Sequence, residues 1–243
     1  IFREFSPAVE RISLDEAFLD LTGSARLMGP AKQVGERLRK RVHDQLALPI
    51  TVGIAPVKMV AKIASAAAKP DGLLEVTASE MKQFLEALPV GRIWGVGPVA
   101  QKRLEALGFH TIGDVACADN DILYHSLGDW GIEIAQLARG EDIRDIEPYR
   151  EAVSYSEEHT FAKDVSAKRE LEPLVREHAE SVARRLRHDA VRAHTVVLKW
   201  KSAQRNAPGA RGYPVFTRRT TLAQPTDDGR TIAENAIGLL HRC

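Results

Sequence analysis

Two adjacent carboxylates interrupt an alternating apolar pattern near the start of this chain of 243 residues, and this feature restricts the fold most strongly. Residues 9–21 read VERISLDEAFLDL, in which apolar and polar side chains alternate on both sides of Asp15 and Glu16. Alternation with a period of two is typical of a half-buried strand. The segment therefore predicts two strands joined by a tight turn at the acidic pair.

The patterns after this hairpin alternate between helix and strand. Apolar residues that recur every four positions indicate helices, and short apolar runs beside turn residues indicate strands. In order, they predict a helix, a strand, a helix, a short strand and a helix at 30–46, 50–55, 57–68, 73–76 and 77–88. The last helix is expected from the capping-box spacing of Thr77 and Glu80. This order predicts an α+β fold, with helices on one face of a mixed or antiparallel sheet.

Residues 89–140 have a different character, because short helical patterns there are separated by glycines. The Gly-Val-Gly run at 95–97 precedes a proline, which suits the first position of a helix. Thr111 and Asn120 are expected to cap two further helices. The region is therefore expected to be all-helical.

A charged segment that contains a proline, at 141–152, is the candidate linker. Beyond it, the periodicity predicts a strand, a long amphipathic helix, two strands and a final helix at 154–161, 170–191, 195–201, 215–222 and 228–240. The expected domains are accordingly 1–88, 89–140 and 153–243.

The net charge of +1 is the sum of two unequal parts. Residues 1–149 carry 17 basic and 21 acidic side chains, a net charge of −4, whereas residues 150–243 carry 17 and 12, a net charge of +5. Ten basic residues and one acid fall within 183–219. Such a concentration of positive charge predicts a polyanionic partner for the C-terminal part.

Other features exclude whole classes of protein. No apolar run reaches the roughly 18 residues needed to cross a bilayer, and the first residues lack the basic and apolar regions of a secretory signal. Two cysteines, Cys117 and Cys243, do not make a disulfide scaffold or a zinc site on their own. We therefore expect a protein of the reducing cytoplasm that has no membrane partner.

The carboxylates of Asp15 and Glu16 are the first candidates for chemistry. Two acids at a tight strand junction lie close together and are poorly neutralised, which suits Mg²⁺ because this ion takes oxygen ligands and shares them with substrate phosphates. Two such ions can stabilise both the attacking and the leaving oxygen of a phosphoryl transfer. A merely solvated turn is the alternative, and the local pattern leaves both possibilities open.

The glycines of Gly95-Val96-Gly97 are the second candidate, with Lys102 and Arg103 one turn further on. Glycines between two short helices expose backbone N–H groups near a helix N-terminus, which suits a phosphate oxygen. Such a contact needs no particular base sequence. An ordinary turn between helices is the alternative, and the local pattern does not choose between them.

The third candidate is a group of basic residues on the last two predicted strands and the loop between them: Lys199, Lys201, Arg205, Arg218 and Arg219. Strands that present cations along an edge or a face can lie against a nucleic-acid backbone, with an affinity that falls steeply with salt. A solvated sheet face is the alternative.

Four stretches, in this order, resemble motifs of the Y-family DNA polymerases, and the resemblance is closest to the bacterial DinB or DNA polymerase IV branch. They read SLDEAFLDLTG at 13–23, APVKMVAKIAS at 55–65, AKPDG at 68–72 and IWGVGPVAQKRL at 93–104. The first resembles the second catalytic motif, the next two the end of the palm, and the last the helix-hairpin-helix of the thumb. The C-terminal part resembles the little finger, so the resemblance covers essentially the whole chain.

The resemblance implies a role for each candidate. Asp15 would ligate two Mg²⁺ ions, and Glu16 would complete the site near the primer 3′-hydroxyl. Lys69 would reach the triphosphate of the incoming dNTP. Gly95 and Gly97 would hold the backbone of primer–template DNA, with the basic strands along the duplex. Polymerases of this family copy past damaged bases with low fidelity.

The resemblance also implies an incomplete polymerase, with a partial palm at 1–88, a thumb at 89–140, the linker at 141–152 and a truncated little finger at 153–243. The family's first catalytic motif, its fingers and the last strand of its little finger have no counterpart here. Two carboxylates without the third would hold Mg²⁺ weakly. The complete protein is expected to be a monomer that binds a sliding clamp through a peptide beyond this chain.

Two functions of different classes follow from these residues. The first is a translesion DNA polymerase that adds deoxynucleotides to a primer 3′-end. The second is a non-catalytic DNA-binding module that holds primer–template DNA through the thumb and the little finger. A general helix-hairpin-helix repair accessory is a third possibility, which would explain residues 89–140 but not residues 13–23.

Overall fold

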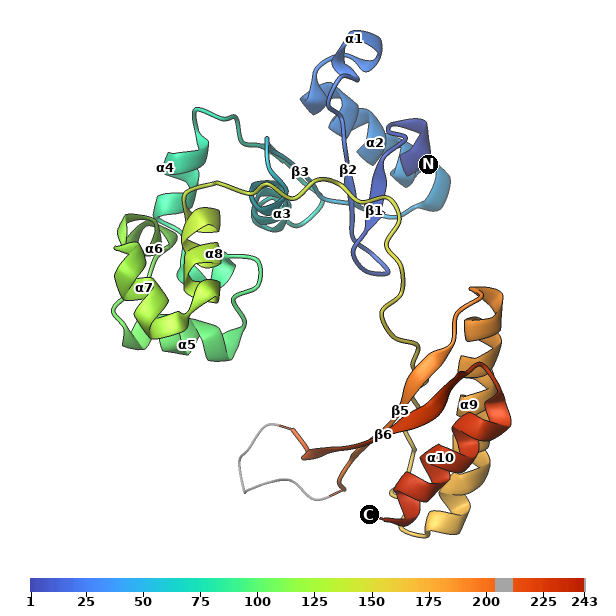
Figure 1. Cartoon of the computed structure of the whole chain (residues 1–243). Helices are drawn as coiled ribbons and strands as arrows, with labels where there is room; N and C mark the ends of the chain where they lie inside the picture. Colours follow the sequence, from blue (N-terminus) through green and yellow to red (C-terminus); the bar gives the residue numbers. More distant parts are fainter. Residues whose placement is uncertain (204–211, 243) are drawn as a thin grey trace. The chain divides into compact units, whose positions relative to one another are not determined.

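The computed structural model describes residues 1–203 and 212–242 (Figure 1). The chain divides into two compact units, Ile1–Arg150 and Glu151–Cys243. The division falls inside the segment at 141–152 that the sequence predicts as a linker. Within the described residues, no helix is both long and apolar enough to cross a membrane.

The first unit begins with the acidic hairpin and continues with strands and then helices. Its elements are η1 (Phe2–Glu4), β1 (Val9–Arg11), β2 (Ala17–Leu19), α1 (Ala25–Met28), α2 (Ala31–Leu46), β3 (Val52–Ile54), α3 (Lys58–Ala67), β4 (Leu73–Glu75), α4 (Met81–Glu86), η2 (Val90–Arg92), α5 (Pro98–Ala106), α6 (Ile112–Cys117), α7 (Asn120–Leu127) and α8 (Asp129–Ala138). The predicted α+β class is confirmed.

The strands of this unit form two separate pairs. β1 and β2 make the predicted antiparallel hairpin, with Val9 opposite Leu19 and Arg11 opposite Ala17. β3 and β4 are parallel and are connected by α3. A single mixed or antiparallel sheet was expected, but within the described residues no strand lies between the two pairs. Each pair is therefore only two strands wide and depends on helix packing for its stability.

Gly53, at the centre of β3, explains how closely α3 approaches this strand. A Cβ atom on Gly53 would lie 2.0 Å from the carbonyl oxygen of Ala61 and 2.3 Å from the amide nitrogen of Ser65. Any side chain at this position would push α3 off the strand. The glycine therefore fixes the depth of α3, the helix that carries two lysines toward the acidic hairpin.

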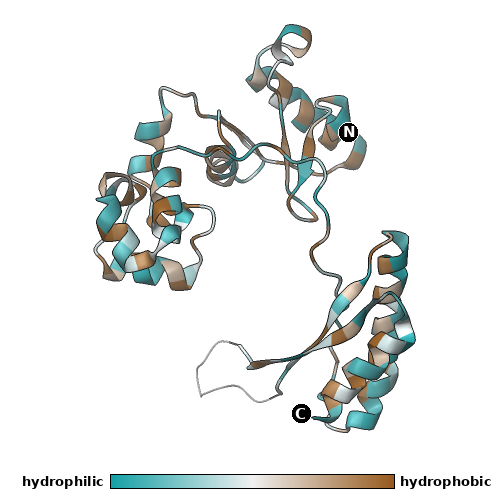
Figure 2. Cartoon of the chain, viewed as in Figure 1, coloured by the Kyte–Doolittle hydropathy of each residue, from teal (hydrophilic) through white to brown (hydrophobic). Residues whose placement is uncertain are grey.

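Two apolar cores stabilise the first unit, and Figure 2 shows the brown apolar faces of its helices beside teal polar ones. The larger core joins α3 to the short helices α4–α8 and includes Met59, Val60, Leu85, Leu104, Ile112 and Leu123. The smaller core lies between α2 and the N-terminal residues and includes Phe5, Val34, Leu38 and Val42. The second of these follows from the four-residue apolar spacing that predicted α2.

Helix caps in the 89–140 region follow the sequence closely. The side chain of Thr111 accepts the N–H of Asp114, and the Asp114 carboxylate accepts the N–H of Thr111 in return, which completes a capping box at the start of α6. Asn120 was expected to cap α7, but the cap is Asp119, whose carboxylate accepts the N–H of Asp121. The shift by one residue reflects the equal capping ability of the two side chains.

The second unit consists of two helices on one face of a two-stranded antiparallel ribbon. Its elements are α9 (Lys168–His188), β5 (Ala193–Lys201), β6 (Val215–Thr226) and α10 (Gly229–His241). Its core includes Ala179, Ala183, Leu186, Val196, Leu222, Ile232 and Ala233. Small alanines on α9 and α10 let the two helices approach each other and the ribbon closely.

The strand predicted at 154–161 is absent, which corrects the sequence interpretation. This segment makes no ladder with a described strand. Side chains of α9 and the residue after it bind it instead: Arg185 donates to the carbonyl of Ser156 at 2.6 Å, and Tyr155 donates to Asp189 at 2.6 Å. An alternating pattern indicates which side chains are buried, but a strand also needs a neighbouring strand to accept and donate its backbone hydrogen bonds.

Candidate active site and nucleic-acid interface

The acidic turn is closed by hydrogen bonds that leave both carboxylates exposed. The N–H groups of Ile12 and Ser13 donate to the carbonyl of Glu16 at 2.9 and 3.3 Å. The Ser13 hydroxyl accepts the N–H groups of Asp15 and Glu16, and it donates to Asp15 Oδ1 at 2.5 Å. Leu14, beside them, is 97% exposed. The turn therefore presents Asp15 and Glu16 as an accessible pair of oxygen donors.

Lys62 of α3 faces this pair, and sequence reasoning missed it. Its Nζ atom lies 2.9 and 2.8 Å from the two carboxylate oxygens of Glu16, and 5.6 Å from the ring centre of Trp94. The only sequence signal is the spacing of Lys58 and Lys62, four residues apart and hence on one helix face. That spacing does not indicate which glutamate each lysine contacts.

The charges around Asp15 favour its ionised form. The hydrogen bond from Ser13 lowers the pKa of Asp15 most, followed by the backbone N–H of Asp15 itself and by the positive charges of Lys69 and Lys62. Lys69, singled out for the triphosphate, thus lies within electrostatic reach of Asp15. The site is a group of two acids and two lysines, open to solvent.

The donor set of the turn fits Mg²⁺ bound jointly with a phosphorylated substrate. Mg²⁺ is commonly held by one or two carboxylates together with phosphate oxygens, rather than by a complete protein cage. Asp15 and Glu16 supply such carboxylates. Across residues 1–203 and 212–242, no group of three or more histidine, cysteine, aspartate or glutamate residues could hold a metal ion. The fit is therefore to an ion that a substrate helps to coordinate.

The Gly-Val-Gly turn lies between η2 and α5, and its three residues differ in what they expose. Gly95 has a φ of +105°, which favours glycine. Gly97 is the N-cap residue of α5, and a Cβ atom on either glycine would meet nothing within 4 Å. Val96 is buried, and its N–H donates to Ile93. The two glycines therefore form the accessible part of the turn.

The basic residues after this turn are also divided in their roles. Lys102 is exposed on α5. Arg103 donates to the carbonyl of Ser126 at 2.6 Å, which ties α5 to the end of α7. Lys102 is thus the better placed of the two to meet a phosphate, while Arg103 has a structural contact.

The β5–β6 ribbon places its basic residues on both faces. In the register, Lys199 is opposite Thr217, Val197 is opposite Arg219 and Leu198 is opposite Arg218. Because side chains alternate along a strand, Lys199, Lys201 and Arg219 share one face and Arg218 lies on the other. These four residues are exposed.

Arg218 belongs to an aromatic group on its face of the ribbon. Its guanidinium lies 5.8 Å from the ring centre of Trp200, and Trp200 stacks on Phe216 at 5.5 Å. The predicted DNA contacts of the ribbon therefore separate into a cationic face with three residues and a cation–aromatic face with one. Arg205 lies outside the described residues.

Comparisons with known proteins match three parts of the chain to one family. The impB/mucB/samB family matches residues 1–66, its C-terminal domain matches residues 152–243, and the IMS family HHH motif matches residues 78–109. The DNA polymerase IV of Desulfatibacillum aliphaticivorans is 39% identical over 242 residues, which cover 100% of this chain and 59% of the relative. The DNA polymerase IV of Brucella melitensis is 36% identical over 243 residues, which cover 100% of this chain and 53% of that relative.

Solved structures give the same result for the fold. A Y-family DNA polymerase chimera of Dbh and Dpo4 has a TM-score of 0.77 and 20% identity, and the alignment covers 99% of this chain and 68% of that chain. DinB from Sulfolobus solfataricus has a TM-score of 0.55 and 20% identity, with 99% and 67% covered.

The chain belongs to the Y family of DNA polymerases. Within that family it is a homologue of DNA polymerase IV, the DinB branch, as the sequence resemblance predicts. It spans 59% and 53% of the lengths of the two curated relatives named above.

Proposed function

We propose that the whole protein is a translesion DNA polymerase, which transfers deoxynucleotidyl units from dNTPs to a primer 3′-end, and that its catalytic carboxylates are Asp15 and Glu16. The observation that carries the proposal is the exposed acidic turn, which pairs with Lys62 and lies within electrostatic reach of Lys69, in a chain homologous to DNA polymerase IV. Anionic phosphates and a metal ion both suit such a mixed site.

The residues of the site divide the work of the proposed reaction. Asp15 and Glu16 would hold Mg²⁺, which when bound stabilises the charge on the attacking and leaving oxygens. Lys69 would place its positive charge against the triphosphate. Lys62 keeps the Glu16 carboxylate on the α3 side of the turn, and because both side chains reach solvent it can release that carboxylate at little cost.

The proposed DNA contacts lie in the thumb and on the ribbon. Gly95 and Gly97 offer backbone at the start of α5, with Lys102 beside them, and the cationic face of the ribbon carries Lys199 and Lys201. Two solved Dbh structures are ternary complexes, one of them an insertion complex of Dbh DNA polymerase, and they support joint binding of the two proposed substrates, primer–template DNA and a dNTP. A DNA substrate, together with bacterial relatives, supports a cytoplasmic site of action at the nucleoid.

The domain roles are part of the same proposal. Residues 1–88 would be a partial palm, 89–140 a thumb and 153–243 a little finger. The match of the HHH motif to residues 78–109 supports the thumb, and the C-terminal family match supports the little finger.

Primer extension by the full-length protein tests the catalytic role. Asp15→Asn and Glu16→Gln should each lower the extension rate by about 100-fold or more, since each removes a charge from the metal-binding turn. Glu36→Gln, an exposed glutamate on α2, makes the same chemical change elsewhere and should have no effect. Unchanged extension by both turn variants would overturn the assignment.

A second candidate function is a DNA-binding module without catalysis. It is favoured by one observation, the cationic face of the ribbon, on which Lys199, Lys201 and Arg219 are exposed. The 243-residue chain would then bind primer–template DNA with strong salt dependence and extend nothing. Lys199→Ala and Lys201→Ala should each reduce the slope of log affinity against log salt by about 1. Extension by the full-length protein would exclude this alternative for the whole protein.

A further inference from the structure

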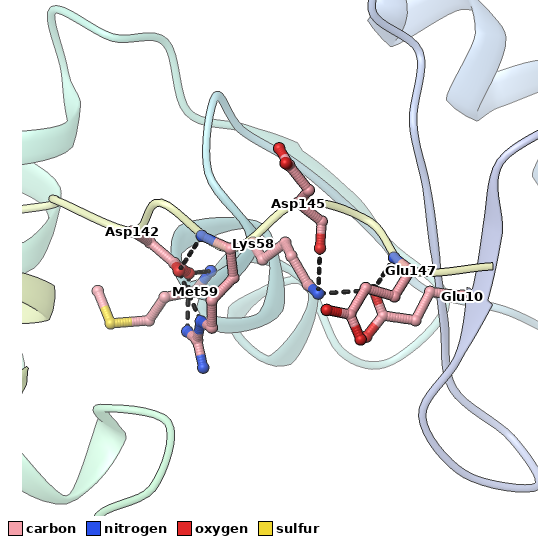
Figure 3. Close-up of polar contacts among 7 residues, drawn as sticks. Glu10, Lys58, Met59, Asp142, Asp145 and Glu147 are labelled. Carbon is pink, nitrogen blue, oxygen red and sulfur yellow. Dashed lines mark hydrogen bonds and ion pairs between the residues drawn. The ribbon is translucent and has the colours of Figure 1, made fainter. Parts of the chain in front are cut away.

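Residues 142–147 cross the N-terminal end of α3 and are bound there by buried polar groups (Figure 3). The carboxylate of Asp142 accepts the N–H of Met59, in the first turn of α3, at 2.9 Å. The N-cap residue Val57 makes no side-chain cap of its own, so a residue 83 positions away from Met59 supplies one. A carboxylate at this position also complements the positive end of the helix dipole.

Arg144 closes the other side of Asp142. Its Nε and Nη2 atoms donate to the two oxygens of Asp142 at 2.6 and 2.7 Å, and the Asp142 side chain is 1% exposed. Burial by itself raises the pKa of Asp142, but the guanidinium of Arg144 and the N–H of Met59 outweigh it and hold the pKa below its ordinary value. The carboxylate is therefore ionised and has partners on both of its oxygens.

A second buried contact joins the same segment to strand β1. Lys58 is 8% exposed, and its Nζ atom donates to Glu10 at 2.6 Å and to the carbonyl of Asp145 at 2.9 Å. The same oxygen of Glu10 accepts the N–H of Glu147 at 2.9 Å. One ammonium and one carboxylate thus bind β1, α3 and residues 145–147 together.

These contacts lead directly to the acidic turn. Lys62, one turn after Lys58 on α3, holds Glu16. The ring of Trp94 lies 4.4 Å from the Arg144 guanidinium, 5.6 Å from the Lys62 ammonium and 5.6 Å from the ring of Phe18 on β2. Residues 142–147, α3 and the acidic hairpin therefore share one aromatic ring as well as two ion pairs.

We infer that residues 142–147 form a strap, and that Glu10, Lys58 and Asp142 act through it as positioning residues for the Lys62–Glu16 pair. The strap fixes where α3 begins relative to β1, and hence where Lys62 meets the turn. The segment bound to α3 and β1 accordingly extends to Glu147, although the sequence predicts a linker from residue 141. What the positioned turn does rests on the proposed function, but the strap itself can be tested separately.

Trypsin cleavage of the full 243-residue chain tests the strap. Arg144 and Arg150 are each followed by an acidic residue, Asp145 and Glu151, so the two sites are chemically matched. In the unmodified chain, cleavage after Arg150 should be at least about 10-fold faster than cleavage after Arg144, because the strap must open before a protease can bind it. Equal rates would overturn the strap.

Two matched variants assign the protection to the ion pair. Glu10→Gln should raise cleavage after Arg144 by about 10-fold, because the Lys58 contact is weakened and the strap opens more often. Glu147→Gln makes the same change in the same cluster, but only the backbone N–H of Glu147 is used, so it should leave cleavage unchanged. Lys58→Met should behave like Glu10→Gln. If trypsin cleaved the Glu10→Gln and Glu147→Gln variants after Arg144 at the same rate, the assignment of the protection to the Lys58–Glu10 pair would be wrong.

Primer extension by the full-length protein tests the positioning role. Glu10→Gln should lower kcat by about 10-fold, since small displacements of reacting groups are costly, with an unchanged Kd for primer–template DNA. Glu147→Gln should change neither value. If Glu10→Gln opens the strap to trypsin but extends primers normally, the positioning role is wrong. If the unmodified protein extends no primer, the proposed function fails, and the trypsin comparison still decides whether the strap exists.

Discussion

Two lysines of one helix each pair with a glutamate of the acidic hairpin, and the two pairs differ mainly in burial. This difference separates a structural contact from an accessible one. Lys58 pairs with Glu10 and Lys62 with Glu16, one turn apart on α3. The side chains of the first pair are 8% and 19% exposed, whereas those of the second are 28% and 46% exposed. A buried pair leaves an unpaired charge when broken, but an exposed pair only exchanges its partner for water.

The comparison teaches that the same residue types at the same spacing serve opposite purposes. The Lys58 pair is bound by two backbone groups of the strap and holds α3 in place relative to β1. The Lys62 pair faces solvent beside Asp15 and can give up Glu16 to a metal ion or a phosphorylated ligand. Four experiments below test this contrast, from the largest expected effect to the smallest.

Removal of the buried lysine should have the largest effect. Lys58→Met leaves Glu10 partly buried without its cation and should lower the free energy of unfolding by about 3 kcal/mol, measured by urea unfolding of the 243-residue chain. Lys40→Met is the control, because Lys40 and Asp44 form an exposed pair on α2 whose loss should cost less than about 0.5 kcal/mol. Equal losses for the two variants would contradict the contrast.

A pair of double-mutant cycles should separate the two contacts directly. We expect a coupling energy of about 2 kcal/mol between Lys58→Met and Glu10→Gln, and of less than about 0.5 kcal/mol between Lys62→Met and Glu16→Gln. Urea unfolding of the single and double variants provides the values. Similar coupling energies for both cycles would show that burial does not distinguish the pairs.

Acid should weaken the buried contacts. Burial raises the pKa of Glu10, but Lys58 and the N–H of Glu147 outweigh it and lower the pKa overall, and the pKa of Asp142 is also lowered. A carboxyl with a lowered folded-state pKa contributes stability above its unfolded pKa, and that contribution is lost as the pH falls below about 4.

The measurement is the urea midpoint at pH 7 and at pH 3.5. The unmodified chain should lose more between the two pH values than Asp142→Asn, which has already lost one of these carboxyls. Equal losses would mean that Asp142 does not contribute to the acid sensitivity.

Removal of Lys62, the more exposed of the two lysines, should have the smallest effect on stability. Lys62→Met should change the free energy of unfolding by less than about 0.5 kcal/mol, because water replaces the lost partner. Urea unfolding beside Lys58→Met gives the comparison. A loss as large as that of Lys58→Met would make the exposed pair structural too.

Local patterns in the sequence predicted much of this molecule, while contacts between distant residues remained out of reach. The acidic hairpin and the Thr111 cap were predicted because the residues that form them lie within a few positions of each other. The Lys58–Glu10 pair joins residues 48 apart, and Glu147 reaches Glu10 across 137 residues. A local sequence pattern does not indicate pairs of residues so far apart. The start of the predicted linker is a bound strap because its contacts are also of this kind.

The sequence pointed to the two acids of the candidate site but not to the residues packed around them. Asp15 and Glu16 stand out because two carboxylates interrupt a strand pattern, and that signal is local. Lys62 reaches Glu16 and the ring of Trp94 only through the packing of α3, which depends on the close approach that Gly53 permits. The strand predicted at 154–161 failed because alternation does not specify a pairing partner.

The contrast between the pairs, and with it the proposed function, is tested most directly by Glu16→Gln and Glu10→Gln in the full-length protein, each measured for urea unfolding and for primer extension. Glu16→Gln should lower extension by about 100-fold or more with an unchanged urea midpoint, while Glu10→Gln should lower the midpoint clearly. Extension at the unmodified rate by Glu16→Gln would contradict the account.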